Sequence, residues 1–417
     1  MNALIKAATI IDSKSSYHGS TVDIRIKYGK IRLIGQNLSL EKGEQLIEKE
    51  HLFVSQGWFD SSVSIGQPGY EERETIENGL RVAAKSGFTG IAVNPNTYPI
   101  LDTSADITFV SKMSEGYAAS IFPIGALTRK SESVDLAELY DMQQSGAVAF
   151  GDYQRAITNP NLLKIALQYT QGFNGLVLSF PQENKIAGPG KMNEGIVSTR
   201  IGLKGIPAIA ESLQIARDLH ILAYTGGRLH IPTISTAASV ALIKEAKNKG
   251  LDISCSVAIH NLFYTDSALE EFNTNFKVLP PLRTQEDVDA LIAGIKDGTI
   301  DMVTSDHNPL DIERKHVEFD NAAFGTIAQE ATFGALLTLV SEKKAIQLLT
   351  NGRERFTQEN SSIEEGTEAN LTLFTTKGST VFSEENILSK SKNACFLGAK
   401  LKGSVYGIIA NQKLVLN

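Results

Sequence analysis

The chain has 417 residues, of which 42% are hydrophobic and 21% are charged, so it is long enough to bury a large core and to contain more than one structural unit. Its formal net charge of −7 and its pI of about 5.6 argue against nucleic acid or an anionic membrane surface as the main partner, because like charges repel. The chain has two cysteines, no apolar run of membrane-spanning length and no signal-peptide pattern at its N-terminus, and we therefore expect a cytoplasmic protein without disulfides.

The first segment of the chain has the pattern of short strands joined by turns. Apolar and β-branched runs alternate with turn-forming steps such as Tyr28-Gly29-Lys30 and Lys42-Gly43, and no helical periodicity runs through the segment. The pattern predicts strands at Ala3–Ile11, Val22–Tyr28, Lys30–Ile34 and Gln45–Ile47.

From Leu52 onward, short apolar runs alternate with amphipathic stretches of helical length. The expected strands are Leu52–Phe59, Gly90–Val93, Ser120–Ile124, Ala147–Phe150, Gly175–Phe180, Arg228–Ile234, Asp252–Ile259 and Asp301–Thr304. The expected helices include Glu74–Ser86, Asp135–Gln144, Leu162–Tyr169, Ile209–Leu219, Ser239–Asn248 and Glu286–Asp297. Alternating strands and helices imply a parallel sheet with right-handed crossovers, and eight such units predict an α/β protein with a (β/α)8 TIM barrel. An open doubly wound sheet is disfavoured, because no Gly-rich phosphate-binding turn follows an early strand.

After Leu349 the chain returns to strand-like fragments. These are expected at Ala369–Phe374, Thr380–Phe382, Leu401–Ile409 and Lys413–Leu416. We therefore divide the chain into an N-terminal β-rich segment at residues 1–54, a barrel at 55–350 and a C-terminal β-rich segment at 351–417.

Several short motifs carry a resemblance to a known family. In chain order they are Pro95-Asn96-Thr97, Gly146-Ala147-Val148-Ala149-Phe150-Gly151-Asp152, Met192-Asn193-Glu194-Gly195, Tyr224-Thr225-Gly226-Gly227-Arg228-Leu229-His230, Lys277-Val278-Leu279-Pro280-Pro281-Leu282-Arg283 and Ser305-Asp306-His307-Asn308-Pro309. Together they resemble the dihydroorotase family of the amidohydrolase superfamily over nearly the whole chain. The resemblance implies a TIM barrel beside a small β-sandwich that the N- and C-terminal segments form together.

Function depends on the residues at the C-terminal ends of the barrel strands. The resemblance implies that Asp60, Asp152 and Asp306 stand at metal-binding positions of the family. Asp306 also stands at the general-base position, and Asn96 stands at a substrate contact. The other family positions have changed. Four metal-ligand histidines of the family correspond to Ser62, Ser64, Phe180 and Thr233, and its substrate-binding arginine, asparagine and histidine correspond to Gly66, Leu279 and Leu310.

These changes predict a site without zinc and without catalysis. Zinc binds imidazole, thiolate and carboxylate, whereas neutral hydroxyls are poor ligands and Phe180 offers no ligand atom. The family reaction needs a metal, which lowers the pKa of bound water from about 15.7 to about 7. We therefore expect no cofactor and neither hydrolysis nor tight binding of dihydroorotate.

Two interpretations of the three aspartates stay open. In the first, they hold one Mg²⁺ or Ca²⁺, because these hard cations prefer oxygen ligands. In the second, they accept hydrogen bonds from Ser62, Ser64, Thr233 and nearby backbone groups.

Three functions are consistent with this sequence. The first is a non-catalytic dihydroorotase homologue of pyrimidine biosynthesis with a structural or regulatory role, for which the resemblance implies a homo-oligomer, assembly with aspartate transcarbamoylase, or both. The second is a working cyclic amidohydrolase with other ligands, for which His230, His260 and His307 are the histidines near strand ends, although we expect structural roles for them. The third is a binding protein for a small molecule in the altered pocket.

Overall fold

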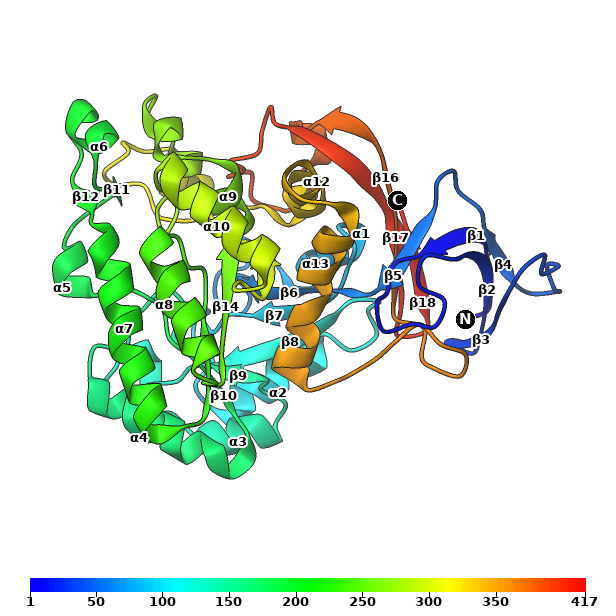
Figure 1. Cartoon of the computed structure of the whole chain (residues 1–417), viewed down its shortest axis with the longest axis horizontal. Coiled ribbons are helices and arrows are strands. Elements are labelled where there is room, and N and C mark those ends of the chain that lie inside the picture. Colours follow the sequence, from blue (N-terminus) through cyan, green and yellow to red (C-terminus); the bar gives the residue numbers. More distant parts are fainter.

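The computed structural model describes all residues from 1 to 417. Figure 1 shows a barrel ringed by helices, with a separate β-sheet unit beside it that contains both ends of the chain. None of the helices combines the length and the apolar character needed to cross a bilayer.

The barrel consists of eight parallel strands in one sheet. In spatial order they are β6 (Trp58–Val63), β7 (Phe88–Val93), β8 (Ser120–Gly125), β9 (Ala149–Phe150), β10 (Leu176–Leu178), β13 (Arg228–Ile231), β14 (Ile253–Ala258) and β15 (Met302–Thr304). A parallel bridge between Val63 and His307 brings the first and last strands together and nearly closes the barrel. The predicted TIM barrel is therefore confirmed.

The first barrel strand begins later than the sequence predicts. The predicted strand Leu52–Phe59 is two strands, because β5 (Phe53–Gln56) belongs to the terminal sheet and β6 starts at Trp58. Gly57 lies between them, and a Cβ atom there would lie 2.0 Å from Thr89 Oγ1. Glycine thus allows the chain to pass between the two sheets at a point of close contact.

The helices surround the barrel. The helices of eight or more residues are α1 (Ile76–Lys85), α2 (Ser104–Met113), α4 (Pro160–Thr170), α7 (Ala208–Thr225), α8 (Ala237–Asn248), α10 (Gln285–Asp297), α12 (Gln329–Leu339) and α13 (Glu342–Thr357). Shorter helices and two short strands complete the barrel unit: α3 (Leu139–Gln144), α5 (Asn184–Ala187), α6 (Ile196–Ile201), α9 (Ile259–Phe263), α11 (Ile312–Lys315), β11 (Met192–Asn193) and β12 (Gly205–Ile206). The six predicted helices are all present, with ends that coincide or are shifted by up to six residues.

Local sequence explains several helix boundaries. Thr284 precedes helix α10 and caps it reciprocally with Asp287, and Gly298 follows the helix with φ of +85°. Helix α12 was not predicted, because its apolar residues face several sides and most of them are buried. Helix α13 crosses residue 350, where we expected the barrel unit to end, so the proposed domain limits stay predictions.

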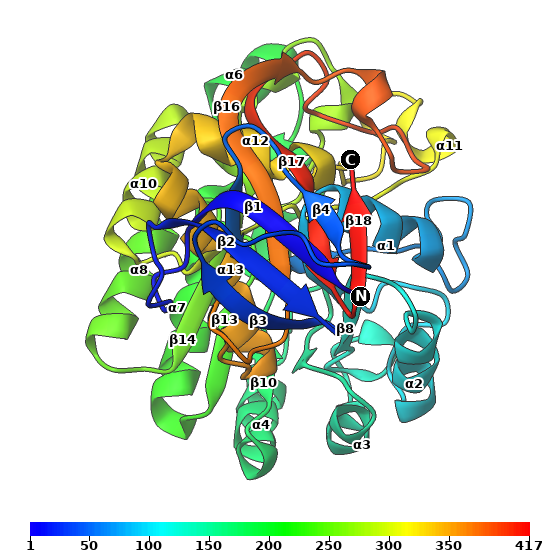
Figure 2. The same ribbon diagram turned by 90° about the vertical axis from the view of Figure 1, so that its right-hand side faces the viewer.

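Both ends of the chain contribute to a single β-sheet unit, as predicted. Its remaining strands are β1 (Ala3–Ile10), β2 (Thr21–Lys27), β3 (Lys30–Gly35), β4 (Gln45–Ile47), β16 (Leu371–Val381), β17 (Lys400–Ala410) and β18 (Lys413–Leu416). The pairing order is β18-β17-β16-β5-β1-β2-β3, with β4 parallel to β1, and Figure 2 shows this sheet face on. It encloses a core of 17 buried hydrophobic residues of its own.

The only tryptophan of the chain lies where the barrel meets the terminal sheet. Trp58 is fully buried, and its ring centre lies 4.6 Å from that of Phe333 on α12 and 5.5 Å from that of Phe374 on β16. Its indole N–H donates to Ser55 Oγ at 3.0 Å. The side chain therefore joins both structural units.

We expect Trp58→Ala to lower the free energy of unfolding by about 3–5 kcal/mol, because it removes a large buried ring and its aromatic contacts. Urea denaturation followed by circular dichroism measures this loss. The matched control is Phe109→Ala on α2, where the ring is 44% exposed and the expected loss is below about 1 kcal/mol. Equal losses in the two variants would contradict the joining role of Trp58.

Candidate functional site at the barrel mouth

The residues that the sequence singles out follow the C-terminal ends of the barrel strands. Asp60 and Ser62 lie in β6, Asp152 follows β9, and Asp306 follows β15. Parallel strands place these ends at one mouth, where a TIM barrel carries its active site. All three aspartates therefore lie at this mouth, where the negative charge of each buried carboxylate needs hydrogen-bond donors or cations.

Asp60 is fully buried and accepts hydrogen bonds from the strand-eight segment. Its Oδ1 accepts from Thr304 Oγ1 at 2.5 Å and from the Ser305 amide at 3.1 Å. Its Oδ2 accepts from Ser305 Oγ and from Gln329 Nε2. Burial raises the pKa of Asp60, and the hydrogen bonds from Ser305 and Thr304 oppose that rise. The lone pairs of this carboxylate are thus used by protein groups.

Asp152 is held by the loop after β8. Its Oδ1 accepts from the amides of Leu127 at 2.9 Å and Thr128 at 3.1 Å, and its Oδ2 accepts from Thr128 Oγ1 at 2.6 Å. Burial raises the pKa of Asp152, and the Thr128 contacts oppose the rise. In this position Asp152 ties two loops together.

Asp306 is bonded by two hydroxyl groups. Its Oδ1 accepts from Ser62 Oγ at 2.8 Å and from the Tyr153 hydroxyl at 3.2 Å. Burial raises the pKa of Asp306 to about 7; the hydroxyl bonds oppose the rise, and the nearby Asp60 adds to it. Ser62 thus donates a hydrogen bond to this buried carboxylate.

Ser64 and Asn96 meet, together with Asn94, in a small amide–hydroxyl network. Ser64 Oγ accepts from Asn96 Nδ2 at 3.0 Å and from Asn94 Nδ2 at 3.3 Å. Asn94 Nδ2 also lies 3.1 Å from Ser62 Oγ. The network engages the amide nitrogen of Asn96, whereas Asn96 Oδ1 is buried without a hydrogen-bond partner.

Two of the residues that the sequence singles out form part of an apolar cluster. Phe180 and Leu279 are 4% and 8% exposed and share a cluster with Ala187, Ile206 and Ala210. Leu310 is also buried. All three of these positions therefore carry buried apolar side chains.

Gly66, where the resemblance implies an arginine in the family, lies in a tight turn. Its carbonyl accepts from the Tyr70 amide at 2.9 Å, and a Cβ atom at Gly66 would lie 1.9 Å from the Tyr70 carbonyl oxygen. No side chain fits there unless the backbone moves.

Thr233 and Asp306 have left-handed backbone conformations, with φ of +49° and +45°. This conformation is unfavourable for a β-branched residue and costs roughly 1–3 kcal/mol. The Thr233 amide donates to Ser256 Oγ at 3.1 Å, which helps to hold the turn.

The mouth encloses a cavity of about 20 Å³, lined by residues that include Ser62, Asp152, Tyr153, Phe180 and Thr233. A cavity of this size holds about one water molecule, and ligand pockets for small molecules measure about 300–1,000 Å³. The mouth in this conformation has no room for a pyrimidine.

The residues at the mouth do not fit a zinc centre. No three His, Cys, Asp or Glu side chains in the structure are arranged to hold a metal ion. Asp60 and Asp306 lie near each other, whereas Asp152 is turned toward Leu127 and Thr128 and lines the small cavity. The structure therefore does not bring the three aspartates together as one oxygen site.

The histidines near the strand ends have structural surroundings. The ring nitrogens of His230 lie 2.9 Å from Ser254 Oγ and 3.2 Å from Ser256 Oγ, and burial lowers its pKa well below the usual value. His307 Nδ1 accepts from the amides that begin α12. His260 is buried without a hydrogen-bond partner, and burial lowers its pKa to about 3. None of the three faces the aspartates as a ligand set.

Sequence reasoning missed the groups that compensate the aspartates. Tyr153, Asn94, Thr304 and Ser305 supply or organise the hydrogen bonds described above. Each of them follows or ends a barrel strand, and that position is the signal that could have identified them.

Because burial raises the pKa of Asp306 to about 7, the folded protein keeps this proton where the unfolded chain, with a pKa of about 3.9, has lost it. The stability linked to the proton is complete below about pH 4 and is lost as the pH rises through 7. Asp306→Asn removes this dependence. We expect the stability of the variant, relative to the unsubstituted protein, to rise by roughly 2 kcal/mol between about pH 5 and pH 8, measured by urea denaturation.

The matched control is Asp297→Asn on the protein surface. A hydrogen bond from Lys244 lowers the pKa of Asp297 to about 2, so its contribution is complete above about pH 4. The relative stability of this variant should stay constant over the same range. Parallel pH profiles for the two variants would show that Asp306 is not the responsible group.

Comparison with known proteins agrees with this geometry at the level of fold. An L-hydantoinase (dihydropyrimidinase) from Arthrobacter aurescens superposes with a TM-score of 0.87 at 20% identity, covering 100% of this chain and 96% of that chain. A D-hydantoinase superposes with a TM-score of 0.84, also at 20% identity, covering 100% of this chain and 95% of that one.

Sequence comparison is more specific. The sequence model of a family described as dihydro-orotase-like matches residues 52–239. Proteins named dihydroorotase are 38% identical over 424 residues in Ruminiclostridium cellulolyticum and 37% identical over 423 residues in Pelotomaculum thermopropionicum. Each alignment covers 100% of this chain and 99% of the relative. With such identity over its full length, the chain belongs to the dihydroorotase family.

Proposed function

We propose that this chain is a non-catalytic member of the dihydroorotase family with a structural or regulatory role. The observation that carries the proposal is the way the three aspartates are bonded. Each of them accepts hydrogen bonds from protein hydroxyls or amides, and together they do not form a metal site.

The chemistry supports this proposal. Hydrolysis of a cyclic amide at neutral pH needs an activated water, and a bound metal supplies it by lowering the pKa of that water. Ser62, Ser64 and Thr233 offer neutral hydroxyls, and Phe180 offers none. The Asp306 carboxylate could accept a proton from water, but its hydrogen-bond partners are neutral hydroxyls and supply no cation that would lower the pKa of that water.

Substrate binding points in the same direction. The family arginine would grip a substrate carboxylate with two parallel hydrogen bonds, and Gly66 stands in its place within a turn too tight for a side chain. Phe180 and Leu279 pack into one apolar cluster. A charged pyrimidine would lose its water there without gaining polar partners.

The scaffold around this mouth is intact, and this supports a retained role. The barrel closes through Val63 and His307, and the family motifs from Asn96 to Asp306 occur in order. A chain that keeps its fold while its mouth is filled fits a part in an assembly. For the partner we propose aspartate transcarbamoylase, by resemblance to inactive dihydroorotase-like chains, with self-association as a further form of assembly.

An active cyclic amidohydrolase is the second candidate, because relatives at 35–38% identity are named dihydroorotase. It requires ligands other than those described here. His230, His260 and His307 are buried in structural surroundings, so activity would need a rearranged mouth. A binding protein for a small molecule is a third candidate, and the water-sized cavity gives it little support at the mouth.

We expect purified protein to contain less than one zinc for every ten chains and to leave dihydroorotate unhydrolysed when zinc is added, because the donor set does not hold the ion. Elemental analysis and a hydrolysis assay measure these outcomes. The matched control is the dihydroorotase of Pelotomaculum thermopropionicum, purified and assayed in the same way. Stoichiometric zinc and turnover abolished by a chelator would overturn the proposal.

If the chain acts in an assembly, it should co-purify with aspartate transcarbamoylase from its native cells. Affinity capture followed by size-exclusion chromatography with light scattering tests this expectation. A chain that stays monomeric and captures no transcarbamoylase would contradict the assembly role, while the metal analysis decides independently whether catalysis is lost.

A further inference from the structure

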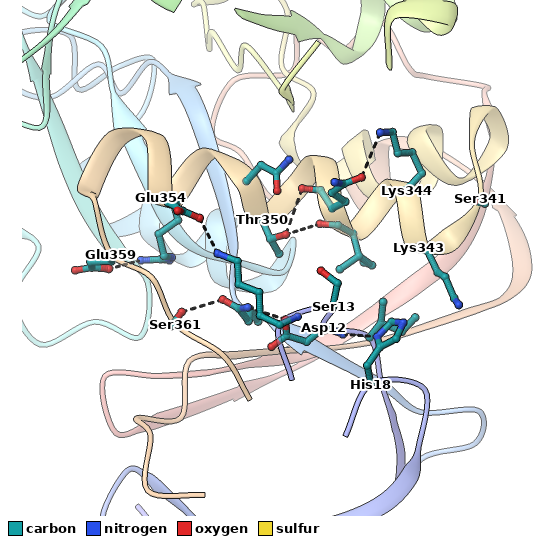
Figure 3. Close-up of a pocket in the computed structure, with 17 residues that line it drawn as sticks. Asp12, Ser13, His18, Ser341, Lys343, Lys344, Thr350, Glu354, Glu359 and Ser361 are labelled. Atoms are coloured by element: carbon teal, nitrogen blue, oxygen red, sulfur yellow. Dashed lines mark hydrogen bonds and ion pairs between the residues drawn. The ribbon is translucent and has the colours of Figure 1, made fainter. Parts of the chain in front are cut away.

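A second cavity lies at the opposite end of the barrel from the mouth. It has a volume of about 490 Å³ and is lined mainly by polar residues. One wall is the loop after β1, the other wall is one face of α13, and Figure 3 shows them facing each other. Arg353 on α13 donates to Thr89 at the start of β7, which places this cleft at the N-terminal ends of the strands.

Most charges in this cleft are already compensated. The Asp12 carboxylate accepts from the amides of Lys14 and Ile363 and from Gln56 Nε2. Lys14 Nζ lies 2.6 Å from Glu354 Oε2. These contacts join the terminal sheet unit to the barrel, and they leave no free carboxylate on the Asp12 side of the cleft.

The corner at the start of α13 carries, in the first turn of the helix, two lysines and one carboxylate, Glu342, and thus a net positive charge. Lys343 and Lys344 have no carboxylate partner, and in Figure 3 Lys343 extends from the helix toward the loop that carries His18. The His18 Nδ1 accepts from the Asp12 amide at 3.2 Å, so the ring proton lies on Nε2 and is available to an acceptor. Ser341 begins the helix without a capping side-chain hydrogen bond.

The inner end of the cleft adds an arginine to these lysines. Arg353 is 7% exposed and lines the cleft, and its Nε has no hydrogen-bond partner. Its Nη1 lies 3.6 Å from Glu359, a weak ion pair with an exposed carboxylate. A buried guanidinium with an unused donor is costly unless a ligand or water meets it.

We propose that this cleft binds a small phosphorylated molecule that also carries hydroxyl groups. The phosphate lies at the start of α13, where first-turn amides, Lys343 and the His18 Nε2–H can donate to its oxygens. Hydroxyl groups of the ligand reach the polar residues along the helix, including Thr350 and Asn351. The volume is that of an ordinary small-molecule pocket.

A phosphate fits this corner better than a carboxylate. The free cations there are lysines, which bind as point charges, and a phosphate offers more acceptor oxygens than a carboxylate to these lysines and to the first-turn amides. Arg353, the arginine of the cleft, has its Nη groups engaged with Thr89 and Glu359. The protein as a whole carries a net charge of −7 and repels anions in general. An anion is therefore attracted to this corner only through the local positive charge there.

Isothermal titration calorimetry of the full chain with ribose 5-phosphate tests the proposal, with succinate as a dicarboxylate of equal charge at matched ionic strength. We expect ribose 5-phosphate to bind about tenfold more tightly than succinate and Lys343→Gln to weaken that binding by about tenfold. Lys343 is exposed, so its substitution should leave the fold intact.

The matched control is Lys249→Gln, which removes the same charge at the exposed end of α8. This variant should bind ribose 5-phosphate as tightly as the unsubstituted protein. Absence of binding at millimolar ribose 5-phosphate would overturn the proposal. So would equal effects of the two lysine substitutions, or succinate binding as tight as that of the phosphate. None of these results depends on whether the barrel mouth is catalytic.

Discussion

The barrel mouth is governed by the requirement that a buried carboxylate must have its charge or its lone pairs compensated. Asp60, Asp152 and Asp306 are all at most 6% exposed, and water cannot solvate them. In a metal site cations would meet this requirement. Here hydroxyl and amide donors meet it, among them Ser62, Thr128 and Thr304. The hydrogen bonds around each aspartate therefore determine what the mouth can do.

Compensation by separate donors has a geometric consequence. A metal draws its ligands toward one point, whereas hydrogen-bond donors draw each carboxylate toward its own partner. Asp152 is turned to the loop after β8, while Asp60 and Asp306 are bonded within β6 and the strand-eight segment. Phe180 and Leu279 fill the remaining volume, as close-packed interiors require. The left-handed backbone at Thr233 persists because the surrounding barrel determines it.

The two ends of the barrel thus differ in the size of the cavity that each contains. The mouth keeps a space of about 20 Å³, whereas the cleft beside α13 measures about 490 Å³. The cleft exists because two structural units meet there with polar rather than apolar faces. Lys14 joins them through Glu354, and a ligand in this place would contact both units. Trp58 holds the same two units together from the apolar side.

The sequence by itself determined the alternating strands and helices of the barrel and the strand-rich ends of the chain, because periodicity and turn residues are local properties. The pairing of the two ends in one sheet was implied only by the family resemblance. The sequence also showed the residue identities at Ser62, Phe180 and Thr233, where the resemblance implies ligand histidines in the family, since residue identity can be read without a structure. Only the tertiary structure decided which donors meet each aspartate, because Tyr153 reaches Asp306 across 153 positions of the chain. Packing between distant segments also decided that the first predicted strand divides at Gly57 and that α12 is buried on several sides. No local pattern records such packing.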